Sequence, residues 1–138
     1  LNDDITLIDT PGLLSEGNII DYIDPKLLNK IIPKKEIKPI TYQLNKGYSI
    51  IINNLIRIDY IKGNKNSFII FASNNLNIRK VNNNKNNELK DTIKKEIQVD
   101  KNNDIIINGL GFVKVINDGL VDIYCPYDLK IFKRSSII

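Results

Sequence analysis

The sequence predicts an α+β fold, with a short α/β segment over residues 1–33 and a mostly antiparallel β domain with one helix over residues 34–138. Residues 5–9 form a short strand pattern that ends in a loop containing Pro11 and Gly12. An apolar stripe at helical spacing then precedes Pro33, and from residue 40 onward short alternating segments are separated by Asn- and Gly-rich turns.

Composition excludes several kinds of site. The chain of 138 residues has no His, which excludes Ser-His-Asp catalysis and His-ligated metals within it. Its single cysteine, Cys125, excludes an internal disulfide and a Cys-cluster zinc site, and its apolar strand context predicts a small buried residue rather than a nucleophile. The net charge of +4 suits an RNA partner or an anionic ligand, although a solvated basic surface explains it equally well. With no apolar stretch of 18 residues, no membrane span is expected.

The first helix has clear boundary signals. Asp24 is suited to cap it and Pro25 to occupy its first position, while Pro33 ends it. Its apolar stripe consists of Leu27, Leu28, Ile31 and Ile32.

The rest of the chain reads mainly as strands. The predicted strands are residues 40–44, 48–52, 55–62, 67–72, 77–81, 104–116, 120–124 and 130–133, with Gly109 and Gly111 interrupting the sixth. Residues 45–47, 53–54, 63–66 and 117–119 are predicted turns, of which 63–66 and 117–119 read as hairpins. Residues 88–97 are predicted to be helical, because Leu89, Ile93 and Ile97 lie at i, i+4 and i+8.

One motif carries phosphate chemistry. Asp9, Thr10, Pro11 and Gly12 follow an apolar strand, as in the switch end of a nucleotide-binding strand. Asp9 would hold Mg²⁺ through water, and the Gly12 N–H would contact a terminal phosphate because no Cβ stands in the way. An ordinary strand-to-loop turn is the alternative. No G-x-x-x-x-G-K-[ST] phosphate loop occurs in the chain, so this polypeptide alone should not hydrolyse a nucleoside triphosphate.

Basic and aromatic residues give a second set of candidates. The predicted phosphate-contacting residues are Lys34, Lys35, Lys38, Lys62, Lys65, Arg79 and Lys80, with a solvated surface as the alternative. Tyr42, Tyr48, Tyr60 and Phe71 are either stacking platforms for single-stranded RNA or core residues. Arg57 and Asp59 share a strand face, where an ion pair is favoured over a ligand contact.

The order of several segments resembles a known family. These segments are Asp9-Thr10-Pro11-Gly12, residues 22–25, residues 32–39, residues 55–63 and residues 108–113. Together they resemble the C-terminal half of the YqeH-type circularly permuted GTPases, a ribosome-assembly group that includes the NOA-type organellar proteins. One departure is Asn53-Asn54, where the family often has a glycine pair; Asn tolerates the left-handed conformation that such a turn needs.

The resemblance implies a permuted order of motifs. The base-reading motif, the phosphate loop and a zinc motif would lie upstream of Leu1, so residues 1–33 would be the tail of a P-loop GTPase domain that binds GTP or GDP with Mg²⁺. Leu13 and Leu14 follow the glycine where a small GTPase has a water-positioning Gln, which predicts slow hydrolysis assisted by K⁺ or by the partner.

The resemblance also implies a partner. The family's C-terminal β domain resembles an RNA-binding attenuation-protein module, so the expected partner is the small ribosomal subunit or its rRNA rather than DNA. The expected compartment is the cytoplasm or an organelle. Two alternatives remain: a stand-alone β module that binds RNA or protein without a nucleotide, and a domain that docks a ribosomal protein.

Overall fold

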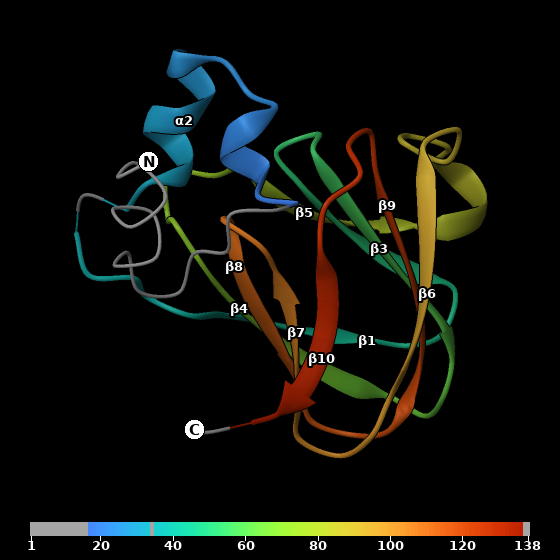
Figure 1. The fold of residues 1–138 in the computed structure, drawn as a ribbon. Helices are drawn as coiled ribbons and strands as arrows, with labels where there is room; N and C mark the ends of the chain where they lie inside the picture. The colour runs from blue at the N-terminus through green and yellow to red at the C-terminus, as the bar shows by residue number, and fades with distance from the viewer. Residues whose placement is uncertain (1–16, 34, 137–138) are drawn as a thin grey trace.

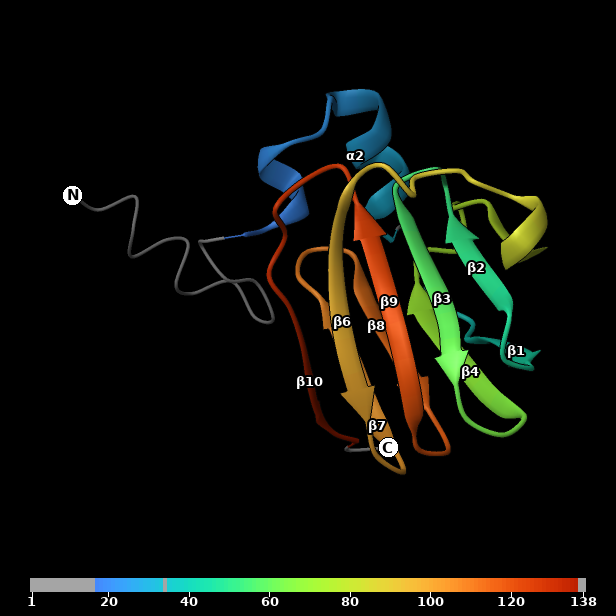
Figure 2. The same ribbon diagram turned by 90° about the vertical axis from the view of Figure 1, so that its right-hand side faces the viewer.

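Two antiparallel β-sheets of five strands each pack face to face in the computed structural model, which describes residues 17–33 and 35–136 (Figure 1). Sheet A has the strand order β1 (Ile40–Leu44), β4 (Asn66–Ala72), β8 (Gly111–Val115), β7 (Asn103–Ile107) and β10 (Ile131–Ser135). Sheet B has the order β5 (Ile78–Asn82), β2 (Tyr48–Ile52), β3 (Ile56–Lys62), β9 (Gly119–Cys125) and β6 (Ile93–Val99), and Figure 2 shows β2, β3, β9 and β6 side by side.

Alternation along each strand produces the core. Successive side chains of a strand point to opposite faces, so every second residue enters the space between the sheets. In β3 these are Ile56, Ile58 and Tyr60, and in β4 they are Phe68 and Ile70, all with at most 2% exposure. The rings of Tyr60 and Phe68 meet edge to face at 5.3 Å across the sandwich.

Short helical elements cover one end of the sandwich, above the strands in Figures 1 and 2. The 3₁₀ turn η1 (Ile19–Asp21) precedes the helix α2 (Pro25–Ile31). The predicted cap is confirmed, because the Leu27 N–H donates to Asp24 Oδ1 at 2.9 Å, and the helix ends just before Pro33 as predicted. Ile19 and Ile31 belong to the same buried cluster as the strand residues.

The predicted helix over residues 88–97 is wrong. Residues 88–91 form a turn and residue 92 a bend, and residues 93–99 form β6, which pairs with β9 along its whole length. A spacing of four residues fits a strand as well as a helix, since four is twice the strand period. Ile93, Ile97 and Val99 therefore share one face of an edge strand.

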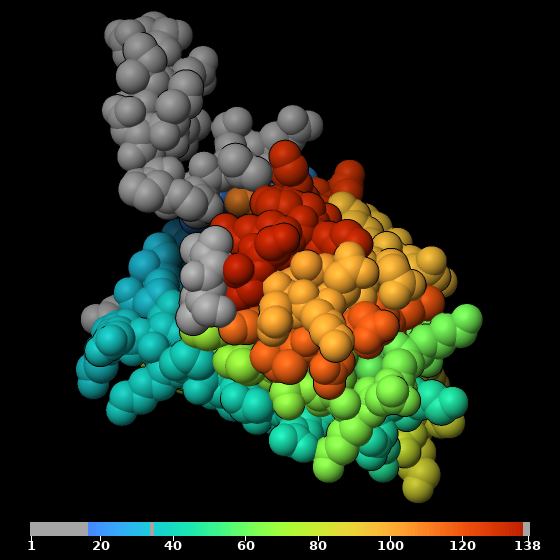
Figure 3. Space-filling view, turned by 90° about the horizontal axis from the view of Figure 1, so that it is seen from below, coloured from blue at the N-terminus to red at the C-terminus, as the bar shows by residue number. Residues whose placement is uncertain are grey.

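Both predicted hairpins, at 63–66 and 117–119, are also wrong, because the chain changes sheets at these turns. β1 lies in sheet A and β2 in sheet B, and the same change occurs between β3 and β4 and between β8 and β9. The turns at 45–47, 63–66 and 117–119 are therefore corners of the sandwich. Figure 3 views the end opposite α2, where β10 lies beside the β6–β7 turn and the Ser136 N–H donates to the Asn102 carbonyl at 2.8 Å.

The turn at Asn53-Asn54 is a true hairpin between β2 and β3. Ile52 pairs with Ile56, and the Leu55 N–H donates to the Ile52 carbonyl at 2.9 Å. Asn53 and Asn54 have φ +48° and +55°, in the left-handed region that Asn adopts more readily than most residues. Asn at both positions therefore supports the turn. The interrupted strand over 104–116 is β7 and β8, joined by a loop with Gly109 at φ +89° and followed by Gly111 at φ +149°.

Candidate functional site

The predicted phosphate-switch residues Asp9, Thr10, Pro11 and Gly12 lie outside the described residues, as does Lys34. Their roles stay predictions. The described chain begins at Gly17, five residues after Gly12.

The remaining predicted basic residues do not gather in one place. The Lys38 N–H donates to Asn74 Oδ1 at 2.7 Å, which places the linker with Lys35 and Lys38 beside the β4–β5 connection. Lys62 and Lys65 flank the β3–β4 turn, at the sandwich end viewed in Figure 3. Arg79 and Lys80 lie on the edge strand β5.

Two of these residues already have protein partners. Arg79 Nη2 forms an ion pair with Glu88, and Lys80 Nζ lies 5.1 Å from the ring centre of Tyr48 and donates to the Gln43 carbonyl at 3.2 Å. Tyr60, a predicted stacking candidate, is fully buried, whereas Phe71 lies on the outer face of sheet A.

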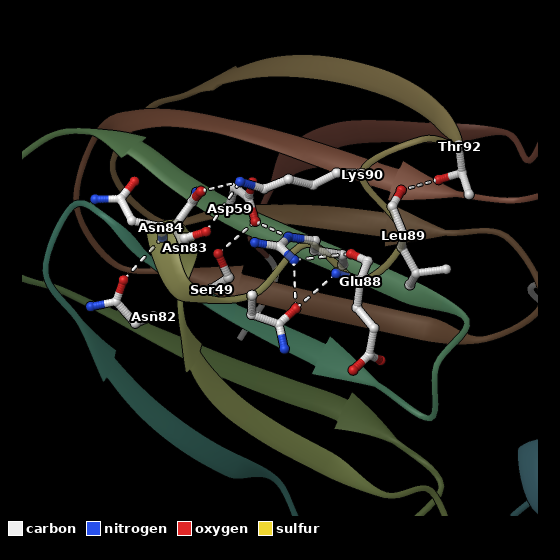
Figure 4. Close-up of polar contacts among 11 residues, drawn as sticks. Ser49, Asp59, Asn82, Asn83, Asn84, Glu88, Leu89, Lys90 and Thr92 are labelled. Carbon is white, nitrogen blue, oxygen red and sulfur yellow. Dashed lines mark hydrogen bonds and ion pairs between the residues drawn. The ribbon is translucent and has the colours of Figure 1, made fainter.

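Arg57 and Asp59 form the predicted ion pair at the centre of a buried polar network (Figure 4). Arg57 Nε lies 2.6 Å from Asp59 Oδ1, which also accepts from Ser49 Oγ at 2.5 Å. Arg57 Nη1 donates to Asn86 Oδ1 and to the Glu88 carbonyl, both at 2.9 Å. The network therefore ties the β5–β6 connection onto the outer face of sheet B.

A row of carboxylates crosses the same face. In the strand register Asp59 lies opposite Asp122, and Asp122 lies opposite Glu96. Burial raises the pKa of Asp122, Lys94 opposes this, and the charges of Glu96 and Asp59 raise the pKa further. Asp122 Oδ1 and Arg57 Nη2 are both buried without a hydrogen-bond partner among the described residues.

The described residues include no reactive thiol and no group of side chains arranged as a metal site. Cys125 is 2% exposed and burial raises the pKa of its thiol, which confirms it as a core residue. No group of three or more Cys, Asp or Glu side chains in the described ranges is arranged to hold a metal ion. No helix of these residues is long and apolar enough to cross a membrane.

Backbone hydrogen bonds fasten residues 17–19 to the β sandwich. The Lys130 N–H donates to the Gly17 carbonyl at 2.9 Å, and the Ile19 N–H donates to the Asn108 carbonyl at 3.0 Å. The Asn108 N–H donates in turn to the Lys130 carbonyl at 3.2 Å. We call residues 17–19, together with Asn108 and Lys130, the junction. It joins the segment that follows the switch motif to the β7–β8 loop and to the start of β10.

Close packing fixes the junction. A Cβ on Gly109 would lie 2.1 Å from Asn18 Oδ1, and a Cβ on Gly17 would lie 2.7 Å from Lys130 N. Asn18 Oδ1 also accepts from the Ile20 N–H at 2.9 Å, which caps η1. Next to the junction, the rings of Tyr22 and Tyr127 stack at 5.1 Å.

The outer face of sheet A carries two rows of side chains beside this loop. One row, which we call the aromatic row, crosses four strands in register and consists of Phe71, Phe112, Ile106 and Phe132. The adjacent row consists of Ile69, Lys114, Asp104 and Arg134. Arg134 Nε lies 3.4 Å from the buried Asp104 Oδ2, and its guanidinium stands 5.5 Å from the centre of the Phe112 ring.

Sequence reasoning missed Asn18, Asn108, Phe112, Phe132 and Arg134. The alternation of residues 131–134 placed Phe132 and Arg134 on one strand face. It did not reveal that β10 pairs with β7, or that the neighbouring strands bring Phe71 and Phe112 into the same row.

Two groups of curated proteins are similar to the chain. It is 30% identical to the uncharacterized protein YqeH of Bacillus subtilis (strain 168) over 160 aligned positions, which cover the whole chain and 44% of YqeH. It is 34% identical to nitric oxide-associated protein 1 of Mus musculus and of Homo sapiens over 67 positions, which cover 48% of this chain and 10% of each relative. The chain thus spans less than half the length of these relatives, and no protein-family model matches it.

Proposed function

We propose that the chain is the C-terminal part of a YqeH-type circularly permuted GTPase that assists ribosome assembly. The support is its homology to YqeH and to nitric oxide-associated protein 1. Residues 1–33 complete the nucleotide site, with Asp9 on Mg²⁺ and Gly12 at the γ-phosphate of GTP. Residues 34–138 recognise the small ribosomal subunit or its rRNA, in the cytoplasm or an organelle. Hydrolysis is slow and is assisted by K⁺ or by the partner.

The similarity to YqeH supports the family part of this proposal, and the junction supports a coupling between the nucleotide site and the β domain. Gly12 is expected to change its backbone conformation when the terminal phosphate leaves. Only five positions of sequence separate Gly12 from Gly17. Gly17 and Ile19 are hydrogen-bonded to Lys130 and Asn108 of the β sandwich. A movement at the switch thus has a short covalent route to a fixed point on the β domain.

The nucleotide half of the proposal is tested by titrating the longer protein, which contains the upstream motifs, with a fluorescent non-hydrolysable GTP analogue. Saturable binding that needs Mg²⁺ is expected. Asp9→Asn should reduce the gain in nucleotide affinity that Mg²⁺ gives. Asp21→Asn removes the same charge from an exposed residue and serves as the control. An absence of nucleotide binding would favour the stand-alone β module.

The RNA half is tested by filter binding of the chain to small-subunit rRNA at several salt concentrations. Phosphate contacts release counterions, so affinity should fall steeply as salt rises. Neutralising Lys34, Lys35 and Lys38 together should weaken binding if the linker contacts phosphates. Binding that ignores both salt and these substitutions would favour a docked ribosomal protein over RNA.

A further inference from the structure

We propose that the aromatic row on sheet A, together with Arg134, binds unpaired bases of single-stranded RNA by stacking. This inference rests on the proposed function for the class of partner and adds the place and the mode of recognition. Its evidence is the arrangement of three phenylalanines and two cations on one sheet face.

The three rings remain partly exposed although they lie within β strands. Phe71 and Phe112 lie opposite each other on β4 and β8, with ring centres 4.5 Å apart and planes 11° apart. Phe132 lies two strands further along the same row, with Ile106 between it and Phe112. None of the three belongs to the core cluster between the sheets. Partly exposed aromatic rings on the outer face of a sheet are the kind of side chain on which unpaired bases stack.

The cations stand where a phosphate backbone would pass. Arg134 lies over Phe112, and Lys130 Nζ lies 5.7 Å from the ring centre of Phe132. Both side chains are exposed, and Asp104 holds the Arg134 guanidinium in place from below. Cations beside aromatic faces combine backbone neutralisation with base stacking, which favours a nucleic acid over an acidic peptide.

A hollow of about 360 Å³ completes the surface. It is lined by Ile106, Ile107, Gly109, Leu110, Gly111, Phe112 and Arg134, and its walls are mainly apolar. Pockets of this size and character suit a flat apolar group with one polar anchor, such as a base splayed out of the strand. The hollow is formed by the loop whose Asn108 belongs to the junction, so a bound base would touch the loop that holds residues 17–19.

The test is fluorescence anisotropy of the 138-residue chain with a labelled single-stranded RNA of mixed sequence. Phe112→Leu keeps an apolar side chain but removes the ring, and Arg134→Gln removes the charge. Each should weaken binding by roughly 5- to 100-fold. One matched control should leave affinity unchanged: Tyr22→Leu removes an exposed ring next to the junction. Arg79→Gln, at a half-exposed arginine of β5 that the sequence also predicted to contact phosphate, tests the competing location on sheet B. An unchanged melting temperature of Phe112→Leu shows that its folding is intact; if it falls, Phe132→Leu is used in its place.

Three outcomes would overturn the inference. Loss of affinity in Arg79→Gln but not in Arg134→Gln would place the RNA on β5. Equal affinity for a fully paired duplex would exclude base stacking, because paired bases present no free face. A concentration-dependent dimer that Phe112→Leu dissociates, without any effect on RNA, would make this face a contact between two copies. None of these three measurements uses GTP, so their outcomes are independent of the GTP titration described above.

Discussion

The backbone N–H of Ile19 donates a hydrogen bond to the carbonyl of Asn108 at 3.0 Å, and the Ile19 side chain is fully buried. Ile19 and Ile31 therefore lie in the same buried core cluster as the strand residues. This contact brings the segment that follows the phosphate-switch motif to the β7–β8 loop. It is the physical basis for the proposed coupling between nucleotide and β domain.

Removing the Ile19 side chain should destabilise the whole β domain. Ile19→Ala leaves a cavity in the core and should lower the free energy of unfolding by about 2–5 kcal/mol. Ile32→Ala makes the same change at a residue that is 46% exposed and should cost no more than about 0.5 kcal/mol. Urea denaturation of both variants measures the difference. Equal losses would mean that residues 17–33 do not share the core.

Breaking the Arg57–Asp59 pair should lower the free energy of unfolding strongly, whereas replacing both residues with apolar ones should lower it much less. Asp59→Asn leaves Arg57 buried and uncompensated, which should cost about 3–5 kcal/mol of unfolding free energy. Replacing both residues with Arg57→Met and Asp59→Leu should recover most of that loss, because no buried charge remains. Glu88→Gln, which removes the exposed pair with Arg79, should cost less than about 1 kcal/mol. A double variant as unstable as Asp59→Asn would contradict the attribution of that loss to an uncompensated buried charge.

The raised pKa of Asp122 predicts a pH-dependent stability difference. The folded protein holds this proton more tightly than the unfolded chain, so the group stabilises the fold below about pH 4 and loses that contribution as pH rises through its folded pKa. Asp122→Asn should therefore gain stability relative to the parent as pH rises from 4 to 7, by up to about 1 kcal/mol. Thermal melts across this range test it, with exposed Asp118→Asn as the control. A difference that does not vary with pH would contradict the raised pKa.

Gly111 should not tolerate a side chain. Its φ is +149°, and a Cβ there would lie 2.1 Å from the Phe71 carbonyl oxygen across the β4–β8 pair. Gly47 has φ +92°, but a Cβ at that position would meet nothing within 4 Å, so Gly47→Ala suffers backbone strain alone. Gly111→Ala should be less stable than Gly47→Ala by at least about 2 kcal/mol. Equal melting temperatures for the two variants would argue against the close approach of β4 and β8.

The local sequence predicted the positions of helices and strands better than it predicted which strands pair. Asp24, Pro25 and Pro33 gave the boundaries of α2, and alternation gave most strands within a few residues. The helix over 88–97 was wrong because Leu89, Ile93 and Ile97 satisfy two periods, and only the partner strand β9 decides between them. The sheet-switching turns look like hairpin turns locally, because the same residues suit both.

The residues of the candidate site were likewise predictable only in part. The Arg57–Asp59 pair was predictable, since both residues lie on one face of one strand. The aromatic row was not, because its members come from four strands whose order in sheet A follows no simple sequence rule. The junction was hidden for a further reason: its bonds are made by backbone groups, which leave no pattern in the sequence.

The central claim is that the state of the nucleotide reaches the β domain through the junction. Amide hydrogen exchange of the longer protein, bound in turn to GDP and to a non-hydrolysable GTP analogue, tests it most directly. The account predicts that protection of the Ile19 and Asn108 amides changes together between the two states, while that of the Ile58 amide in the centre of sheet B stays constant. Unchanged protection at Ile19 and Asn108, with both nucleotides demonstrably bound, would contradict the coupling.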